Sequence, residues 1–358
     1  MARKALLPLS VLYGAAAFIR NRAFDAGVLR ASRAPVPVIA VGNLTAGGTG
    51  KTPLVRWLVR RLRERNVRVA VVSRGYGRRS RGVLVVADSA SVRVDAARGG
   101  DEPVMIARGE PGVGVVVGER RHDAARRAAG ELGAEVIVLD DAFQHRSIHR
   151  DVNILLLDAS VDIRREPLLP AGMRREGLAG IRRADLVVWS GVQAAEERTR
   201  LESSIRRWYT GPGAGVRYDL VSYTSCADGR RAGVDEFRGK AVFAFCAIGR
   251  PERFLRSLRG RGLEVKDWVT FRDHHWYGGA DIEGLLDRFA RSGAELLMTT
   301  EKDAVRLESD PVAAENFLRA FPVWYPALEV VPVWGEAEML AAVDRAGEGR
   351  STSVFHSR

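Results

Sequence analysis

The sequence predicts an α/β protein with a mostly parallel sheet flanked by helices and a second, smaller α/β domain. Short apolar runs recur along the chain, and polar, Arg-rich helical stretches separate several of them. Strands buried on both faces have such continuous apolar sequences. Strands that alternate with helices indicate a parallel sheet covered on both faces, whose ligands bind at the carboxyl ends of the strands.

Composition limits the classes of protein that fit. With 358 residues, 46% of them hydrophobic, the chain can bury a large core and is expected to form more than one domain. A formal net charge of +12 favours an acidic partner, such as nucleic acid, an anionic membrane or a phosphorylated substrate. Cys226 and Cys246 are the two cysteines and have no metal-ligand spacing, which argues against a disulfide framework or a zinc site and fits a reducing compartment.

The N-terminal segment combines an apolar run with basic flanks. The run LLPLSVLYGAAAFI covers residues 6–19, and Arg3, Lys4, Arg20 and Arg22 flank it. It is shorter than the roughly 20 residues that span a bilayer, which predicts a helix lying in the membrane interface. A secretory signal peptide and a buried core helix are the alternatives.

The next strand and helix bracket a glycine-rich loop. The run VIAV at 38–41 predicts a buried strand, and Leu54, Trp57, Leu58 and Leu62 recur at helical spacing after the loop. Further strands are expected at 69–72, 83–86, 113–117, 136–139, 154–157 and 186–189.

The loop TGPGAG at 210–215 predicts a domain boundary, because glycine and proline favour connecting segments. Strands at 241–247, 265–269 and 296–299 then suggest the second unit. The predicted division is a membrane-associated segment (1–33), a nucleotide-binding domain (34–215), a smaller α/β domain (216–345) and a flexible tail (346–358).

The loop TAGGTGKT has the composition and the strand–loop–helix context of a phosphate-binding P-loop. Its backbone N–H groups can surround phosphate oxygens, Lys51 can reach the β- and γ-phosphates, and the Thr52 hydroxyl can ligate Mg²⁺. Thr45 stands where the usual pattern has glycine, and a glycine-rich turn without a ligand is the alternative. The predicted nucleotide-binding residues are Thr45, Ala46, Gly47, Gly48, Thr49, Gly50, Lys51 and Thr52.

A pair of carboxylates follows the apolar run at 136–139. Asp140 and Asp141 are placed as the acid that supports Mg²⁺ beside a P-loop would be. The sequence leaves open which of the two ligates the metal.

Together, these residues resemble the tetraacyldisaccharide 4'-kinase family. The motifs extend over nearly the whole chain, and their number and order make the resemblance specific. They are VGNLTAGGTGKTP (41–53), SRGYGR (73–78), GDEP (100–103), LDDAFQH (139–145), LLPAGMRRE (168–176), FRDHHWY (271–277) and TEKDAVR (300–306). Ala142 replaces an expected glycine, and Met173 with Arg174 departs from the family pattern.

The resemblance implies a P-loop NTPase-like kinase domain that uses ATP and Mg²⁺. Such a kinase transfers the γ-phosphate of ATP to the 4'-hydroxyl of a tetraacylated glucosamine disaccharide 1-phosphate. The implied location is the cytoplasmic face of the bacterial inner membrane, with peripheral or monotopic attachment. The implied partners are this anionic glycolipid and the membrane surface, without nucleic acid or an obligate protein partner. A P-loop GTPase or ATPase switch resembling a metallochaperone, and a basic nucleic-acid-binding module, are the competing hypotheses.

The resemblance also implies roles for individual residues. Asp101 would be the catalytic base, His274 would pair with it, and Lys51 would be the third catalytic residue. The residues alone leave two alternatives, namely that Asp101 caps a helix and that His275 is the active histidine. The predicted substrate-binding residues are Arg74, Tyr76, Glu102, Gln144, His145 and Arg175, and Glu176 joins Thr52, Asp140 and Asp141 as a predicted metal ligand.

The segment TEKD at 300–303 partly resembles a guanine-specificity motif but lacks its asparagine and its spacing. We interpret it as a helix start, with Thr300 as the N-cap and Asp303 at the third helical position.

Overall fold

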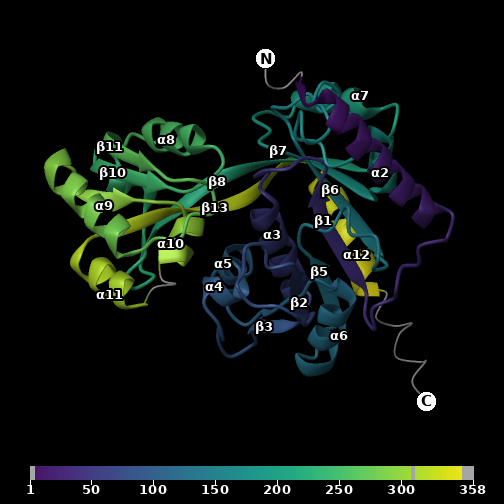
Figure 1. Ribbon diagram of the computed structural model, residues 1–358, viewed down its shortest axis with the longest axis horizontal. Helices are drawn as coiled ribbons and strands as arrows, with labels where there is room; N and C mark the ends of the chain where they lie inside the picture. Colours follow the sequence, from purple (N-terminus) through teal and green to yellow (C-terminus); the bar gives the residue numbers. More distant parts are fainter. Residues whose placement is uncertain (1–4, 308–310, 349–358) are drawn as a thin grey trace.

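The structure is a computed structural model that describes residues 5–307 and 311–348. One mixed, 13-stranded sheet runs through two lobes and joins them (Figure 1). This confirms the predicted mostly parallel sheet flanked by helices.

The first lobe has β1 (Val38–Asn43), the strand that precedes the predicted phosphate loop, at the centre of its part of the sheet. Its strands are β1 (Val38–Asn43), β2 (Val69–Ser73), β3 (Leu84–Ala87), β4 (Gly114–Val117), β5 (Val136–Leu139), β6 (Val152–Asp158) and β7 (Leu186–Ser190). They are ordered β7-β6-β1-β5-β2-β4-β3, and among them only β3 is antiparallel to its neighbour. The carboxyl ends of β1, β5 and β2 therefore lie side by side.

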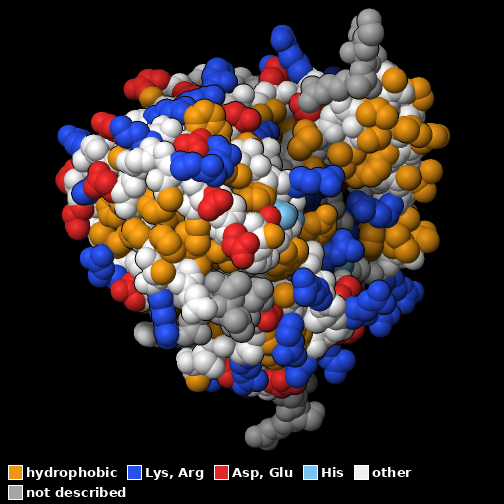
Figure 2. Space-filling view, turned by 60° about the vertical axis from the view of Figure 1, so that its left-hand side comes forward, with side chains coloured by type: hydrophobic (Ala, Val, Ile, Leu, Met, Phe, Trp, Pro, Cys, Tyr) orange, Lys and Arg blue, Asp and Glu red, His pale blue; other side chains and the backbone are white. Residues whose placement is uncertain are grey.

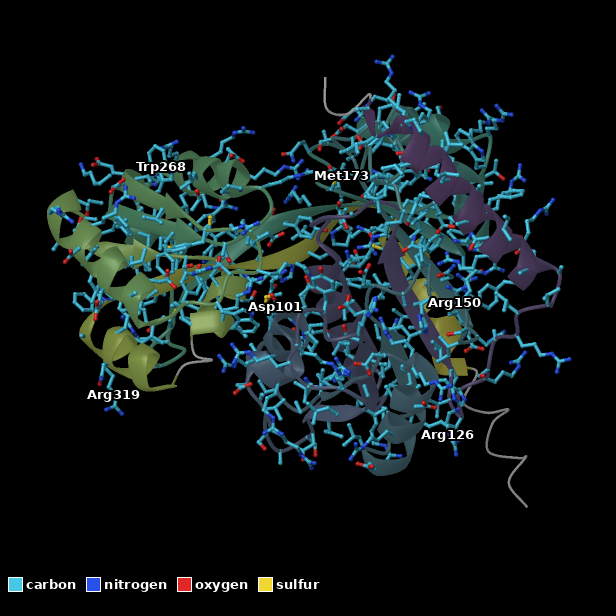
Figure 3. All side chains as sticks on the ribbon, in the orientation of Figure 1. Asp101, Arg126, Arg150, Met173, Trp268 and Arg319 are labelled. Atoms are coloured by element: carbon cyan, nitrogen blue, oxygen red, sulfur yellow. The ribbon has the colours of Figure 1, made fainter. Side chains whose placement is uncertain are left out.

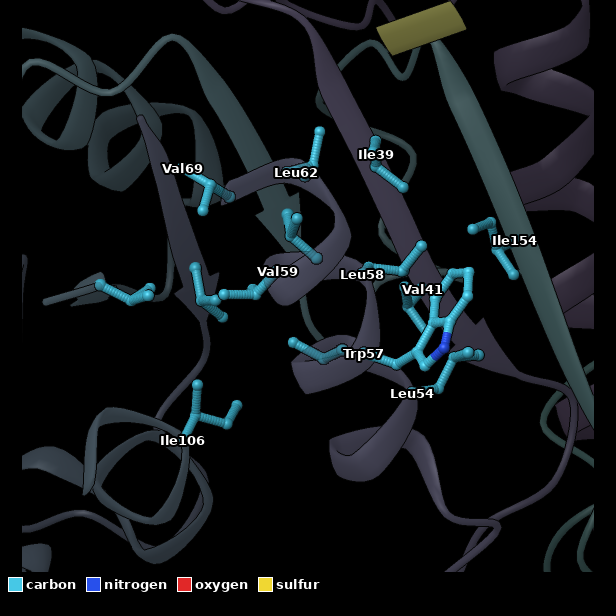
Figure 4. Packing of buried hydrophobic residues seen from close by; sticks show 14 of the residues in the cluster. Ile39, Val41, Leu54, Trp57, Leu58, Val59, Leu62, Val69, Ile106 and Ile154 are labelled. Atoms are coloured by element: carbon cyan, nitrogen blue, oxygen red, sulfur yellow. The ribbon is translucent and has the colours of Figure 1, made fainter. Parts of the chain in front are cut away.

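Helices cover this part of the sheet. They are α3 (Lys51–Glu64), α4 (Ala96–Gly99), α5 (Asp101–Gly109), α6 (Arg121–Glu131) and α7 (Glu197–Ile205), with the 3-10 helix η1 (Leu178–Arg183). The predicted apolar face of α3 is buried, and Leu54, Trp57 and Leu58 pack against side chains of β1 and β6 (Figure 4). This packing fixes α3, and with it the loop that precedes it, against the centre of the sheet.

Two long strands connect the lobes. β8 (Gly213–Ser225) and β13 (Val323–Trp334) pair antiparallel, and β8 also continues the first-lobe sheet through β7. The prediction that 210–215 is a loop is wrong from Gly213 onward. Glycine is needed here because indole rings approach the backbone: a Cβ on Gly213 would lie 2.9 Å from Trp189, and one on Gly215 would collide with Trp334.

The second lobe is a smaller α/β unit. Its strands are β10 (Ala241–Cys246), β11 (Glu264–Thr270) and β12 (Leu296–Met298), with β9 (Arg231–Ala232) paired to β8, and the order β11-β10-β12-β13 is parallel. Its helices are α8 (Pro251–Gly260), α9 (Gly279–Ser292), α10 (Glu301–Leu307) and α11 (Pro311–Ala320), with the 3-10 helix η2 (Val234–Phe237).

The chain then returns to the first lobe, where α12 (Glu336–Glu348) packs against α3 and the strands β6 to β8. The predicted division into domains stays a prediction. Its boundary at 215/216 falls inside β8, and its second domain, 216–345, includes the start of α12. Of the predicted tail at 346–358, residues 349–358 lie outside the described part of the chain.

The predicted N-terminal helix is present as α2 (Leu7–Asp25), which is longer than the apolar run that predicted it. Within 5–307 and 311–348, no helix has the length and apolarity needed to cross a bilayer. α2 lies along the outside of the first lobe, in purple in Figure 1.

Candidate active site

The predicted phosphate loop connects β1 to α3 at the carboxyl edge of the sheet. Gly47 and Gly50 have positive φ angles of 101° and 82°, which glycine adopts without steric cost. Gly50 caps α3 and Lys51 is its first residue, so the loop and the helix N-terminus together form a site for an anion. The Asn43 side chain donates to the Thr49 hydroxyl at 2.8 Å and fixes the middle of the loop.

A second loop, 168–176, runs beside the phosphate loop. The Ala46 N–H donates to the Met173 carbonyl at 2.7 Å, and the Arg175 N–H donates to the Leu44 carbonyl at 2.7 Å. The motif LLPAGMRRE therefore supports the phosphate loop through its backbone; Met173 of this motif is labelled in Figure 3.

The two carboxylates after β5 have different surroundings. Asp140 is fully buried, and its Oδ2 accepts from the Ser73 hydroxyl at 3.3 Å, while its Oδ1 has no hydrogen-bond partner among the described residues. Burial, reinforced by the negative charges of Glu102 and Asp141, raises the pKa of Asp140 to about 7. A buried, unpaired acceptor beside a phosphate loop fits a metal ligand.

Asp141 instead forms ion pairs with two predicted site residues. Its carboxylate lies 3.5 Å from Lys51 Nζ and 2.9 Å from Arg175 Nη1. Burial opposes ionisation, but these two cations outweigh it and hold the pKa of Asp141 below its usual range. Asp141 has a φ of 48°, which is uncommon for a residue other than glycine, and it is the second residue after β5.

Glu176, the other predicted metal ligand, has its carboxylate engaged by neighbouring side chains. Its side chain is fully buried, and its two oxygens accept from Arg183, Gln144 and Asn21 at 2.8–3.0 Å. Three partners already satisfy the carboxylate, so the arrangement does not support the prediction that Glu176 ligates the metal. Gln144 also donates to the Asn43 carbonyl at 2.8 Å, and so ties this cluster to the start of the phosphate loop.

His145 is surrounded by positive charge. Burial, together with the charges of Arg121, Arg150, Arg74 and Arg20, lowers the pKa of His145 to about 4. Its imidazole is therefore neutral at pH 7 and forms a hydrogen bond with the Ser147 hydroxyl at 2.9 Å. Arg74 is exposed directly after β2.

Asp101 and His274, far apart in the sequence, meet between the lobes. Asp101, labelled in Figure 3, begins α5, and its Oδ2 lies 3.1 Å from His274 Nδ1. Gly100, with a φ of 92°, precedes Asp101, and a Cβ at Gly100 would lie 2.9 Å from the Gly75 backbone. The motifs SRGYGR and GDEP are thus in direct contact, and a larger residue at position 100 would push Asp101 away.

The structure distinguishes the two histidines that the sequence left open. His274 adopts a left-handed φ of 62° and turns toward Asp101, and the exposed Tyr76 ring lies 5.2 Å from its ring. His275 turns the other way, pairs with Asp281 at 3.0 Å and stacks on Phe271. The geometry therefore favours His274 as the functional histidine, with His275 in a structural role.

Two cations from α10 complete this cluster, and the sequence analysis gave neither a role. Lys302 Nζ lies 3.1 Å from Glu102 and 3.7 Å from Asp101, and the buried Arg306 donates to Asp101 from Nε at 2.9 Å. Burial would raise the pKa of Asp101, but the hydrogen bond with His274 and the charges of Lys302 and Arg306 hold it far below its usual range. The motif TEKDAVR contains both cations and was the available signal; its helix-start interpretation also holds, because Thr300 Oγ1 accepts from the Asp303 N–H at 3.2 Å.

Tyr218 is another contact that the sequence did not indicate. From β8, its hydroxyl donates to the carbonyls of Thr49 and Gly50 at 3.2 and 3.1 Å. A Cβ at position 50 would collide with this hydroxyl, which is a second reason for glycine there.

Comparison with known proteins gives a consistent result. The model of the family described as "Tetraacyldisaccharide-1-P 4'-kinase" matches residues 2–347. The tetraacyldisaccharide 4'-kinase of Anaeromyxobacter dehalogenans is 41% identical over 343 residues, covering 95% of this chain and 87% of the relative. That of Chlorobaculum parvum is 38% identical over 325 residues, covering 88% and 87%. The crystal structure of LpxK from Aquifex aeolicus in complex with ATP matches with a TM-score of 0.77 and 32% identity, covering 97% of this chain and 99% of that one.

Proposed function

The chain belongs to the tetraacyldisaccharide-1-P 4'-kinase family and is an ATP-dependent kinase of lipid A biosynthesis, and we propose that its Asp101–His274 pair activates the sugar 4'-hydroxyl. The observation that carries this proposal is the contact of the pair across the two lobes, since the other residues of the site suit any P-loop nucleotide enzyme. A neutral alcohol needs a proton acceptor when it attacks phosphorus.

The surroundings divide the roles within the pair. Asp101 is held as an anion by Arg306 and Lys302, so it is a weak proton acceptor. His274 Nδ1 faces Asp101, which leaves Nε2 to take the hydroxyl proton, and Asp101 then stabilises the imidazolium. This modifies the role implied by the family resemblance, in which Asp101 itself is the base.

The phosphate side uses the loop and the residues near it. The backbone N–H groups of 47–52 and the Lys51 ammonium are proposed to bind the triphosphate, and Lys51 can stabilise charge on the transferring group. Thr52 and the unpaired oxygen of Asp140 would hold Mg²⁺, which usually has one or two carboxylate ligands besides phosphate oxygens and water. When bound, this ion neutralises phosphate charge. Arg175, which pairs with Asp141, Tyr76, which lies beside His274, and the exposed Arg74 are proposed to contact substrate.

The glycolipid substrate is proposed to reach the site from a membrane surface on which α2 rests. Large apolar side chains of α2 are exposed, among them Val11 (70%), Leu12 (67%) and Phe18 (63%). Figure 2 shows an orange patch of such side chains at its upper right, where Figure 1 places the start of α2, with basic side chains below it. Apolar side chains flanked by cations suit an anionic lipid interface, and we propose the cytoplasmic face of the inner membrane because ATP is available there.

The test is a product assay with the full chain. Purified protein, labelled ATP, Mg²⁺ and the tetraacyldisaccharide 1-phosphate in detergent micelles should yield a lipid phosphorylated at the 4' position. The Lys51→Ala variant should lose at least about 10²-fold in kcat. Nucleotide hydrolysis that is equal with and without lipid, and no phosphorylated lipid, would instead indicate the nucleotide-switch alternative.

A further inference from the structure

Arg306 lies at the point where the two lobes meet the proposed catalytic pair. It belongs to α10 of the second lobe, its side chain is about 1% exposed, and α10 packs against α5, which carries Asp101. An arginine this deeply buried requires compensating partners, because desolvation of its charge is costly.

The contacts of its guanidinium join both lobes. On the second lobe, Nη1 donates to Asp303 at 3.1 Å and to the Ala247 carbonyl at 2.8 Å. On the first lobe, Nε and Nη2 both donate to Asp101 Oδ2. The same Oδ2 faces His274 Nδ1, and Arg306 Nη2 lies 3.2 Å from that nitrogen.

Hydrogen bonds within the second lobe hold the groups on which Arg306 rests. The Asp303 carboxylate accepts from the Ala247 N–H at 3.1 Å and from the Thr300 hydroxyl at 2.6 Å. The His274 N–H donates to the Ala247 carbonyl at 3.3 Å, the same oxygen that accepts from Arg306. The planar guanidinium thus fixes the position of Asp101 relative to the Ala247 carbonyl, which also accepts from the His274 N–H. A flexible lysine ammonium cannot make these contacts with the same geometry.

We propose that Arg306 is a positioning residue that locks Asp101 of the first lobe onto His274 of the second, so that the proton-accepting pair is complete only while the lobes are in contact. This rests on the proposed role of the Asp101–His274 pair. Arg306 does not touch substrate in this scheme; it acts through Asp101, and its charge also limits how tightly the pair holds a proton.

A change at Arg306 should therefore alter the pH dependence as well as the rate. The other charged groups facing the pair are Lys302 at 3.7 Å from Asp101, Asp273 at 4.0 Å from His274 Nε2, and Glu102, which pairs with Lys302. The buried Asp303 pairs with Arg306 at 3.1 Å and loses this partner when Arg306 is changed, whereas the contacts of Lys302 do not involve Arg306. Removal of one positive charge lets the pair retain its proton to higher pH. The acid limb of the pH profile of kcat/KM, where activity is lost as the pair is protonated, therefore moves to higher pH.

The experiment compares Arg306→Met with Arg306→Lys and with wild type. In Arg306→Met we expect kcat to fall by about 10²-fold, KM for ATP to change by less than about twofold, and the acid limb to move up by about one pH unit. Arg306→Lys should keep the acid limb near that of wild type because the charge is kept. Its kcat should fall by about tenfold because the ammonium lacks the fixed planar set of donors of the guanidinium. The matched control is Arg56→Met, which removes another buried interlobe arginine that pairs with Glu110 and Glu301 and should leave the acid limb in place.

The outcomes separate this proposal from the one on which it rests. A wild-type protein that fails to phosphorylate the lipid would contradict the proposed function. An active wild type whose acid limb is unchanged in Arg306→Met, or shifted equally in Arg56→Met, would overturn the positioning role. If Arg306→Met does not fold, as judged by circular dichroism and ATP binding, Arg306→Lys decides: wild-type kcat in that variant would overturn the proposal.

Discussion

At the scale of single residues, Asp101 and His274 are expected to act as one unit. Asp101→Asn keeps the shape of the side chain but loses the charge that stabilises an imidazolium, so kcat should fall by about 10²–10⁴ while ATP affinity is retained. His274→Ala should cost a similar factor, and the double variant should lose much less than the product of the two single losses. Steady-state kinetics and ATP titration measure both effects.

His275→Ala is the matched control for this cycle. It removes the adjacent histidine, which pairs with Asp281 rather than with Asp101, so kcat should change by less than about threefold. Multiplicative losses in the double variant would show that Asp101 and His274 act independently.

At the scale of elements, α2 connects the proposed membrane surface to the nucleotide site. Its polar side chains face the 168–176 loop: Ser10 donates to the Leu168 carbonyl, Tyr13 to the Arg175 carbonyl and Asn21 to Glu176, at 2.8–2.9 Å. Its apolar side chains are left outside, the reverse of a helix that packs on a protein core. The loop held by α2 is the one that lies beside the phosphate loop.

Three changes on the exposed face test this arrangement. The combined variant Val11→Asp, Leu12→Asp and Phe18→Asp should bind vesicles containing anionic phospholipid at least about 100-fold more weakly, because each buried apolar side chain contributes about 1.5–3 kcal/mol. ATP binding should persist. Trp268→Asp, at an exposed apolar residue on the edge strand β11, is the control and should bind vesicles as wild type does. Unchanged sedimentation of the triple variant with vesicles would refute the membrane-surface role of α2.

At the scale of the whole molecule, buried ion pairs hold the lobes together beside the active site. Arg56 of α3 pairs with Glu110 of the first lobe at 3.0 Å and with Glu301 of α10 at 2.9 Å. Arg56→Met should lower the free energy of unfolding by about 3 kcal/mol, because Glu301 loses its arginine partner and the buried Glu110 is left with Arg60. The midpoint of urea unfolding measures this change.

Arg291→Met is the control for the ion-pair prediction. Arg291 forms an exposed pair with Asp287 within α9, and its loss should cost less than about 0.5 kcal/mol. Similar losses in the two variants would show that the interlobe pair adds no specific stability.

Much of the fold followed from local sequence. The apolar runs predicted most strands of both lobes, because a strand buried on both faces needs an uninterrupted apolar stretch. The strands β8 and β13 were missed since they are long, partly exposed and interrupted by glycine or proline, so their pairing depends on each other and not on a local pattern. The loop between β1 and α3 was predicted from local sequence, because its glycines, Lys51 and Thr52 lie within a few residues of one another between an apolar run and a helical pattern.

The sequence by itself determined the class of fold, the glycine-rich connection between β1 and α3 and, through its motifs, the family. Only the tertiary structure decided that Glu176 is occupied by Arg183, Gln144 and Asn21 and that Arg306 joins the lobes. It also decided, where the residues alone left the choice open and the resemblance implied His274, that His274 meets Asp101 while His275 pairs with Asp281. The physical reason is separation along the chain: Asp101 and Arg306 are 205 residues apart. Hydrophobic periodicity and turn chemistry are local properties, whereas the partner of a buried charge is fixed by how distant elements pack.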